Sequence, residues 1–268
     1  MMLAAPQTMI SAIIAAMIIL WWLGGVVLGG VLVYWTIIIG EGTYFGKPVV
    51  RWIYSRGAGM YDHVRRNVTT TDGVQLAIPL CVALRHQPTA AALDVATGTG
   101  RVPLLLAAEE WYSGAIIGLD LTPAMLRIAQ HKAAAYGWAE RIEWQLGSGD
   151  DLRRWPDASF GVVTCLEALE YFPRPARAVR EMWRVLAADG TLIISTWTAH
   201  HARMLPGKAW TASKMMAFLR SLGCTSIKTH PWQIGQYDLV IAVKRSQKLK
   251  VKIASDNENR KSKNKQQS

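Results

Sequence analysis

The sequence predicts an α/β fold, a doubly wound and mainly parallel sheet, joined to an N-terminal transmembrane helix. Short apolar runs alternate with helical patterns between residues 71 and 244, which is typical of a parallel sheet covered by helices. Residues 9–39 contain no charged side chain, and these 31 residues exceed the length of about 20 that a membrane span needs. A chain of 268 residues is long enough for one such domain and an anchor.

The expected elements follow one another in a regular order. Strands are expected at 92–96, 115–120, 141–147, 160–166 and 191–197, with a closing hairpin pair at 225–233 and 237–244. Helices are expected at 74–86, 102–111, 123–137, 175–190 and 212–223. Thr71 or Asp72 is a candidate cap for the first helix, Pro123 begins the third, and Gly190 is expected to end the fourth.

We interpret the uncharged stretch as a single transmembrane span. A helix of 31 residues is about 46 Å long, so it is expected to tilt or to extend past the hydrocarbon layer of about 30 Å. The alternative is a tight hairpin broken at Gly24-Gly25 or Gly29-Gly30, but each span would then average about 15 residues, too few to cross. Gly25 and Gly29 also form a GxxxG pair through which a homodimer could pack.

The distribution of charge sets the topology and the domain boundaries. The net charge is +11 and 51% of the residues are hydrophobic, but residues 93–243 carry 15 basic and 14 acidic side chains. A nearly neutral body argues against nucleic-acid binding. Basic residues follow the span and none precedes it, which predicts that the body lies on the cytoplasmic side of the membrane.

The predicted parts are a short segment 1–8, an anchor 9–39, a basic and aromatic juxtamembrane connector 40–70, a domain 71–244 and a disordered basic tail 245–268.

The three cysteines lie far apart, at Cys81, Cys165 and Cys224. They form neither a CxxC motif nor an even disulfide set. The sequence therefore predicts no metal site, and it fits a reducing compartment.

A glycine-rich turn follows the first expected strand, in the order Asp94-Val95-Ala96-Thr97-Gly98-Thr99-Gly100. Gly98 and Gly100 remove side chains where the turn would pass close to a ligand. Asp120 ends the second strand, and a carboxylate at that position can accept hydrogen bonds from both ribose hydroxyls. Because ligands of such sheets bind beyond the carboxyl ends of the strands, the pattern predicts a site for a nucleoside cofactor. The third glycine of the dinucleotide fingerprint is absent, which disfavours an NAD(P)-dependent oxidoreductase.

This order of strand, acid and glycines resembles the class I S-adenosylmethionine-dependent methyltransferases, and more narrowly their ubiquinone/menaquinone methyltransferase-like branch (methyltransferase type 11). The resemblance covers about residues 60–244 and includes LDLTPAML (119–126), DDLRRWPDASFGVV (150–163), TCLEALEYF (164–172) and REMWRVLAADGTLIIST (180–196). It implies a Rossmann-like sheet of seven strands, S-adenosyl-L-methionine as cofactor, and methyl transfer to a small-molecule or lipid acceptor.

The resemblance also implies ten cofactor-binding residues. They are Asp94, Ala96, Gly98, Gly100, Asp120, Leu121, Met125, Ser148, Gly149 and Cys165. Asp94 is expected to fix the loop, Asp120 to hold the ribose, and Met125 to lie beside the adenine. Ser148 stands where family members usually carry an acid for the adenine amine, with Asp150 as a substitute if the loop shifts.

The sequence assigns no catalytic residue. The candidate bases are polar side chains after the fourth and fifth strands, although such side chains are more often rim or loop residues than bases: Glu167, Glu170, Tyr171, His200 and His201. Tyr171 stands where many family members have His, which leaves open a non-catalytic, anchored module that keeps the cofactor. The anchor favours a lipophilic acceptor such as a quinone or a lipid, although it could serve only for location.

Overall fold

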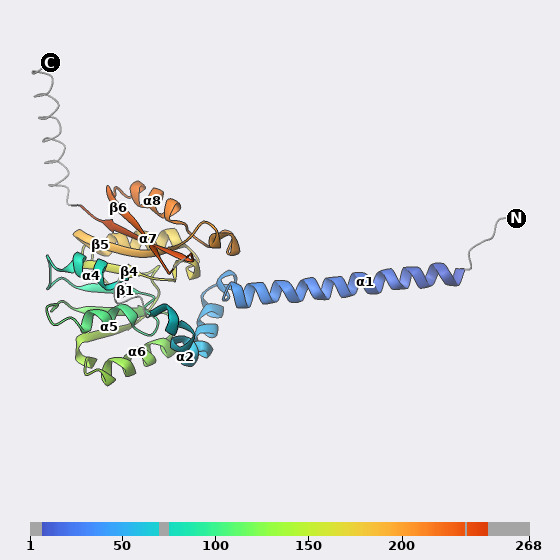
Figure 1. The fold of residues 1–268 in the computed structure, drawn as a ribbon, viewed down its shortest axis with the longest axis horizontal. Helices are drawn as coiled ribbons and strands as arrows, with labels where there is room; N and C mark the ends of the chain where they lie inside the picture. The colour runs from blue at the N-terminus through green and yellow to red at the C-terminus, as the bar shows by residue number, and fades with distance from the viewer. Residues whose placement is uncertain (1–6, 70–74, 234, 246–268) are drawn as a thin grey trace, which may run out of the picture.

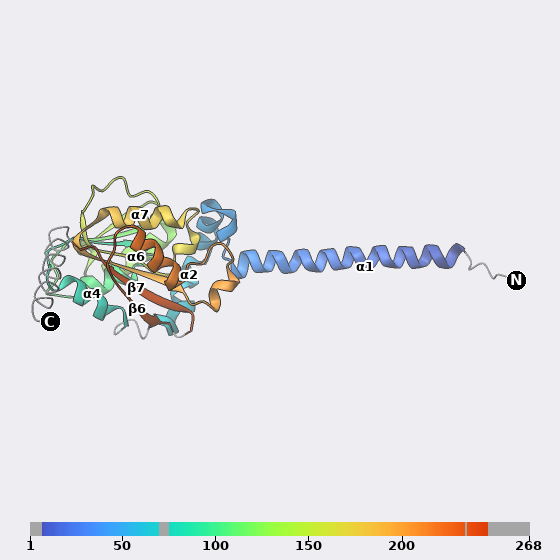
Figure 2. The ribbon, with the colours of Figure 1, turned by 90° about the horizontal axis from the view of Figure 1, so that it is seen from above.

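An α/β domain forms the body of the molecule, and one long helix projects from it (Figure 1). The computed structural model describes residues 7–69, 75–233 and 235–245. One sheet of seven strands has the order β3-β2-β1-β4-β5-β7-β6, and every pairing in it is parallel except those made by β7. Figure 2 shows α7 and α4 on opposite sides of this sheet. The prediction of a Rossmann-like, mainly parallel seven-stranded sheet is confirmed.

The elements appear in the predicted order, with small differences at their ends. The strands are β1 (Ala92–Val95), β2 (Ile116–Asp120), β3 (Ile142–Leu146), β4 (Phe160–Cys165), β5 (Leu186–Trp197), β6 (Ser226–Trp232) and β7 (Tyr237–Val243). The helices are α1 (Gln7–Tyr34), α2 (Lys47–Thr69), α4 (Ala77–Leu84), α5 (Arg101–Ala107), α6 (Pro123–Ala135), α7 (Pro175–Val185) and α8 (Ala212–Ser221). Short helical turns are η1 (Trp35–Ile39), η2 (Thr43–Phe45), η3 (Ala139–Arg141), η4 (Leu169–Tyr171) and η5 (His201–Met204). The predicted caps Thr71 and Asp72, and the predicted tail beyond Arg245, lie outside the described residues.

The central strand β1 is the switch point of the topology. It pairs with β2 on one side and with β4 on the other, and every residue of these three strands is buried. Burial on both faces explains why their sequences are almost continuously apolar. The chain order reverses at β1, so the loops after β1 and β4 diverge and leave a crevice at the carboxyl edge of the sheet.

The helix predicted for residues 175–190 is shorter than its sequence pattern indicates. α7 ends at Val185, and Leu186 already pairs with Phe160 as the first residue of β5. Asp189 then adopts a positive φ of 61°, which turns the chain. The prediction that this helix continues to Gly190 is wrong, because pairing with the buried sheet outweighs the helix propensity of the intervening alanines.

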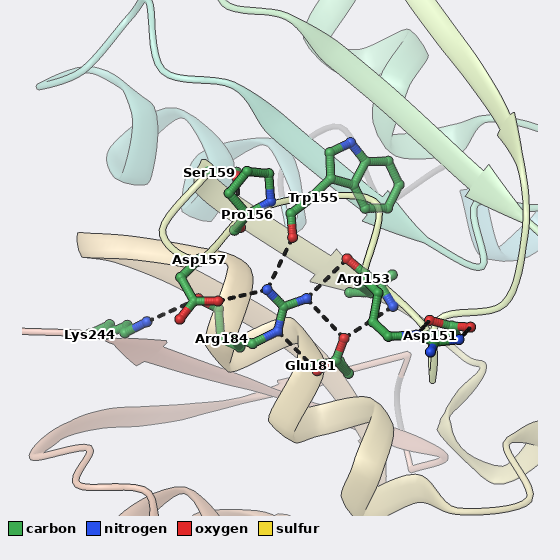
Figure 3. A network of polar contacts seen from close by, with 10 residues as sticks. Asp151, Arg153, Trp155, Pro156, Asp157, Ser159, Glu181, Arg184 and Lys244 are labelled. Carbon is green, nitrogen blue, oxygen red and sulfur yellow. Dashed lines mark hydrogen bonds and ion pairs between the residues drawn. The ribbon is translucent and has the colours of Figure 1, made fainter.

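A cluster around Arg184 fixes the loop between β3 and β4 (Figure 3). Its guanidinium forms ion pairs with Glu181 at 2.9 Å and with Asp157 at 2.8 Å. It also donates to the backbone carbonyls of Leu152 and Trp155, both at 3.0 Å. The loop is thereby held against α7, and its first residues reach the crevice.

Among the described residues, α1 with η1 is the one helical segment long and apolar enough to cross a membrane. Met9–Ile39 has a mean hydropathy of 2.4, and Trp21 and Trp22 are 82% and 73% exposed. A Cβ atom added at Gly25 or Gly29 would meet open space. The π-helical turn η1 widens the end of this segment, which stops at Gly40.

A short strap, residues 40–46, joins α1 to the domain. The Thr43 hydroxyl donates to the carbonyl of Glu170, which follows β4, and the Tyr44 hydroxyl donates to the carbonyl of Pro206, which follows β5, at 3.0 Å. Both contacts place the strap at the carboxyl edge of the sheet. α2 then crosses this edge and packs on α6, and both ribbon views show α2 beside the end of α1 (Figures 1 and 2). The long apolar helix therefore meets the domain at the edge where the strands end.

Candidate active site

A cleft lies between the carboxyl ends of the strands and the inner face of α2. The loops after β1, β2, β3 and β4 form its other walls. Seven of the ten residues predicted to bind the cofactor line it: Ala96, Gly98, Asp120, Leu121, Met125, Ser148 and Gly149. The fold thus gathers side chains from three separate loops around one space.

The loop after β1 has an unusual backbone. Ala96, Gly98 and Gly100 all have positive φ angles, of 57°, 56° and 86°. Such angles are natural for glycine and strained for alanine, so Ala96 holds a conformation that glycine would adopt at lower cost. Gly100 has a packing role as well, because a Cβ atom there would lie 2.6 Å from the Trp144 ring.

The Asp120 carboxylate closes this loop onto β2. One of its oxygens accepts a hydrogen bond from the backbone N–H of Gly98, and the other accepts one from Thr122, both at 2.8 Å. Burial raises the pKa of Asp120, and these backbone hydrogen bonds oppose the rise. Each carboxylate oxygen can accept a second hydrogen bond, so the group can hold the loop and a diol at once.

Three of the predicted residues lie behind the wall of the cleft. Asp94 accepts hydrogen bonds from the hydroxyls of Thr97, at 2.6 Å, and Thr164, so it braces the loop from below. Burial raises its pKa to about 6. Gly100 faces Trp144, and Cys165 is fully buried at the end of β4.

Sequence reasoning missed the contribution of α2 to the cleft. Lys47, Val50, Tyr54 and Tyr61 line it, although they belong to the segment predicted as a juxtamembrane connector. Their spacing of three, four and seven residues puts them on one face of a helix. This amphipathic spacing is visible in the sequence, but it does not show which surface the helix covers.

Lys47 also changes the expected role of Asp150. The Lys47 ammonium and the Ser148 hydroxyl both donate to the same oxygen of Asp150, at 2.5 and 2.6 Å. Burial opposes ionisation, but these two donors hold the pKa of Asp150 below its usual range. Ser148 lines the cleft while Asp150 anchors Ser148 to the first turn of α2.

Comparison with known proteins shows what the central part of the chain is similar to. Residues 93–194 match the family model described as a methyltransferase domain. This segment is similar to methyltransferase domains. The chain is 42% identical over 113 residues to the demethylmenaquinone methyltransferase of Deinococcus radiodurans, covering 42% of this chain and 44% of that protein. It is 33% identical over 111 residues to the ubiquinone/menaquinone biosynthesis C-methyltransferase UbiE of Geotalea daltonii, covering 41% of this chain and 47% of that protein.

Solved structures share the fold of the α/β domain. YcgJ of Bacillus subtilis aligns with a TM-score of 0.51 at 19% identity, over 63% of this chain and 98% of that one. The [4+2]-cyclase SpnF aligns with a TM-score of 0.53 at 18% identity, over 64% of this chain and 81% of that one. The chain spans about half the length of the curated relatives it matches. The methyltransferase family implies S-adenosyl-L-methionine as cofactor.

Two of the five candidate bases line the cleft, Glu167 and Tyr171. Glu167 forms ion pairs with Arg65 of α2 and with Arg101 of α5, the latter at 2.8 Å. It also accepts a hydrogen bond from Gln233 at 2.6 Å. A carboxylate with three donors is a brace between α2 and the loops rather than a free base.

The remaining candidate bases are directed elsewhere. His200 and His201 belong to the segment after β5, where the His201 ring lies 3.2 Å from the Thr198 hydroxyl. Glu170 is 2% exposed, and its carboxylate accepts a hydrogen bond from Tyr237 at 3.2 Å. None of these three lines the cleft among the described residues.

Replacing Glu170 with Gln is expected to flatten the pH dependence of stability. Burial raises the pKa of Glu170 from 4.5 to about 7. The folded state therefore keeps a proton that the unfolded state releases, and the free energy of unfolding falls as the pH rises through this window. The variant should lose less stability than the wild type between pH 5 and pH 8, by up to about 3 kcal/mol. Urea unfolding at both pH values measures this, and equal losses in the two proteins would contradict it.

Proposed function

We propose that the chain is a membrane-anchored, S-adenosylmethionine-dependent methyltransferase that acts on a small lipophilic acceptor, a quinone-like molecule or a lipid. The observation that carries this proposal is the position of the cleft. It opens at the same edge of the domain to which the strap connects the long apolar helix. The curated relatives are named for methylation in menaquinone and ubiquinone biosynthesis, which supports an acceptor of this class.

The residues of the cleft fit the cofactor. Asp120 offers acceptor oxygens for the ribose, Leu121 and Met125 offer apolar contact for the adenine, and the turn at Gly98 leaves room for close approach of the backbone. When bound, S-adenosylmethionine supplies a methyl group that is already activated. The chain therefore needs to position the acceptor and exclude water, and α2 with its inner aromatic face suits both tasks.

We further propose that residues 9–39 cross the membrane once and that the domain lies on the cytoplasmic side. Basic side chains follow the span in α2, and Arg51, Trp52 and Arg56 are exposed there. The Arg56 guanidinium lies 4.7 Å from the centre of the Trp52 ring. Exposed tryptophan and arginine beside a span are typical of a segment that contacts lipid headgroups. The functional unit would then be the domain together with the strap and α2.

Methyl transfer into membrane lipids tests the proposal. The full-length protein would be reconstituted with a total bacterial lipid extract and given S-adenosylmethionine labelled in its methyl group. We expect label in the organic phase, and we expect none above background for the Asp120→Ala variant. Calorimetric titration with S-adenosylhomocysteine, and separately with NADH, shows which cofactor the protein takes.

Each other outcome points to a different function. Binding of S-adenosylhomocysteine without any transfer would indicate a non-catalytic module. Binding of NADH in place of S-adenosylhomocysteine would indicate an oxidoreductase. Label found only in water-soluble products would remove the lipophilic acceptor and leave the methyltransferase activity.

A further inference from the structure

The strap carries a carboxylate into the wall of the cleft. Glu41 is the only charged residue among the first 43 of the sequence. Its backbone has a positive φ of 45°, and Gly42 follows with a φ of 71°. A Cβ atom at Gly42 would lie 2.7 Å from Ile53 and 2.9 Å from Val49, so the strap packs tightly against α2. The position of Glu41 is therefore fixed by the fold.

Two tyrosines of the cleft converge on this carboxylate. The Tyr171 hydroxyl, from η4, donates to one oxygen of Glu41 at 2.5 Å, and the Tyr54 hydroxyl, from α2, donates to the same oxygen. The two rings meet edge to face, with centroids 5.4 Å apart. Both tyrosines line the cleft, whereas Glu41 lies behind them. Three segments far apart in the sequence thus form one hydrogen-bonded group.

The direction of these hydrogen bonds determines what the phenols can offer to a ligand. A carboxylate accepts hydrogen bonds and donates none, so each tyrosine directs its only hydroxyl proton toward Glu41. Burial raises the pKa of Tyr54 and of Tyr171 well above the ordinary value, so both phenols keep that proton. Each hydroxyl oxygen can then offer another partner its lone pairs, but no proton. A ligand can then satisfy them only by donating a hydrogen bond.

We propose that Glu41 is a positioning residue for specificity: it sets Tyr54 and Tyr171 as hydrogen-bond acceptors, so that the cleft selects methyl acceptors bearing an O–H or N–H group. This inference rests on the proposed function only in treating the ligand of the cleft as the methyl acceptor. An acceptor with only ether or ester oxygens at this position would bring its own oxygen lone pairs against those of the two phenols, with no hydrogen between them. Such a mismatch in a buried site lowers affinity about tenfold or more. The strap of the membrane anchor would in this way take part in substrate selection.

The test compares two probes that differ by one donor. 4-Nonylphenol has a hydroxyl group, and 4-nonylanisole has a methoxy group in its place. Calorimetry with detergent-solubilised, full-length protein saturated with S-adenosylhomocysteine gives the affinity for each. We expect the wild type to prefer the phenol about tenfold.

Three variants separate positioning from simple structural support. Glu41→Leu removes the acceptor shared by both phenols, which lets them turn their protons toward the cleft, so the preference should fall to near equality or reverse. Tyr171→Phe should reduce the preference as well. Tyr44→Phe is the matched control, because Tyr44 lies on the same strap but donates to Pro206, and it should keep the wild-type preference.

The outcomes distinguish this inference from the proposed function. Affinity of each variant for S-adenosylhomocysteine shows whether the cofactor side of the cleft is intact. The inference is overturned if Glu41→Leu keeps the wild-type preference, if the wild type binds both probes equally, or if it does not bind the phenol. A normal preference together with an absence of methyl transfer would remove the proposed activity and leave the selectivity of the cleft standing.

Discussion

Replacing Asp120 with Ala is expected to lower the affinity for S-adenosylhomocysteine by at least about 100-fold. Two hydrogen bonds from a ribose to a carboxylate are worth about 1.5–3 kcal/mol each, and their loss also frees the turn that Asp120 holds. The backbone N–H groups of Gly98 and Thr122 both donate to this carboxylate. Calorimetric titration of the purified full-length variant measures the change, and a thermal unfolding curve shows how far the loop destabilises the domain.

The control for this experiment is Asp151→Ala, a neighbouring loop aspartate. Asp151 is exposed and pairs with Arg153 at 2.7 Å, outside the cleft. This control variant should bind S-adenosylhomocysteine as the wild type does. An Asp120→Ala variant that folds and keeps its affinity would remove the ribose assignment.

Replacing Glu167 with Ala is expected to cost about 3–5 kcal/mol in the free energy of unfolding. The carboxylate is almost fully buried and is shared by Arg65 and Arg101, whose side chains are only about one-fifth exposed. Without it, two partly buried guanidinium groups lose a common anion, and α2 loses a contact with the loop after β4. Denaturant unfolding of the detergent-solubilised protein measures the loss.

A second readout separates local from global damage in the Glu167→Ala variant. Because α2 forms one wall of the cleft, affinity for S-adenosylhomocysteine should also fall even where the domain stays folded. Glu110→Ala serves as the matched control, since Glu110 is exposed and lies outside the cleft, and it should change neither quantity. A stability loss of less than about 1 kcal/mol in Glu167→Ala would show that this ion-pair group does not hold α2.

Much of the fold could be predicted because its signals are local. Buried parallel strands appear as continuous apolar runs, and the turn after β1 contains the glycines that its positive φ angles require. Asp120 could be singled out because it stands at the end of a strand, where the topology alone directs it to the carboxyl edge. The end of α7 could not be predicted, because the pairing of Leu186 with Phe160 is a contact between distant segments.

Only part of the cleft could be predicted from the sequence. The loops that hold seven of the predicted residues were found through their motifs, whereas the wall made by α2 carries no motif. Tyr171 lies in the stretch TCLEALEYF (164–172), but its sequence position did not show that its ring meets Tyr54 of α2. The seven-residue spacing of Tyr54 and Tyr61 is compatible with one face of a helix, but a juxtamembrane segment can turn that face toward lipid, toward solvent or toward the domain. Only the docked helix shows that its aromatic face covers the cleft.

The sequence by itself determined the long apolar segment, the order of strands and helices, and the strand-end groups of a nucleoside site. These follow from hydrophobic periodicity and from local backbone geometry, which neighbouring residues dictate. The tertiary structure decided that the strap and α2 close the cleft, that Asp150 pairs with Lys47, and that Glu41 meets two tyrosines. Those contacts join residues up to 130 positions apart, and only the packing of the whole chain brings such groups within hydrogen-bond distance.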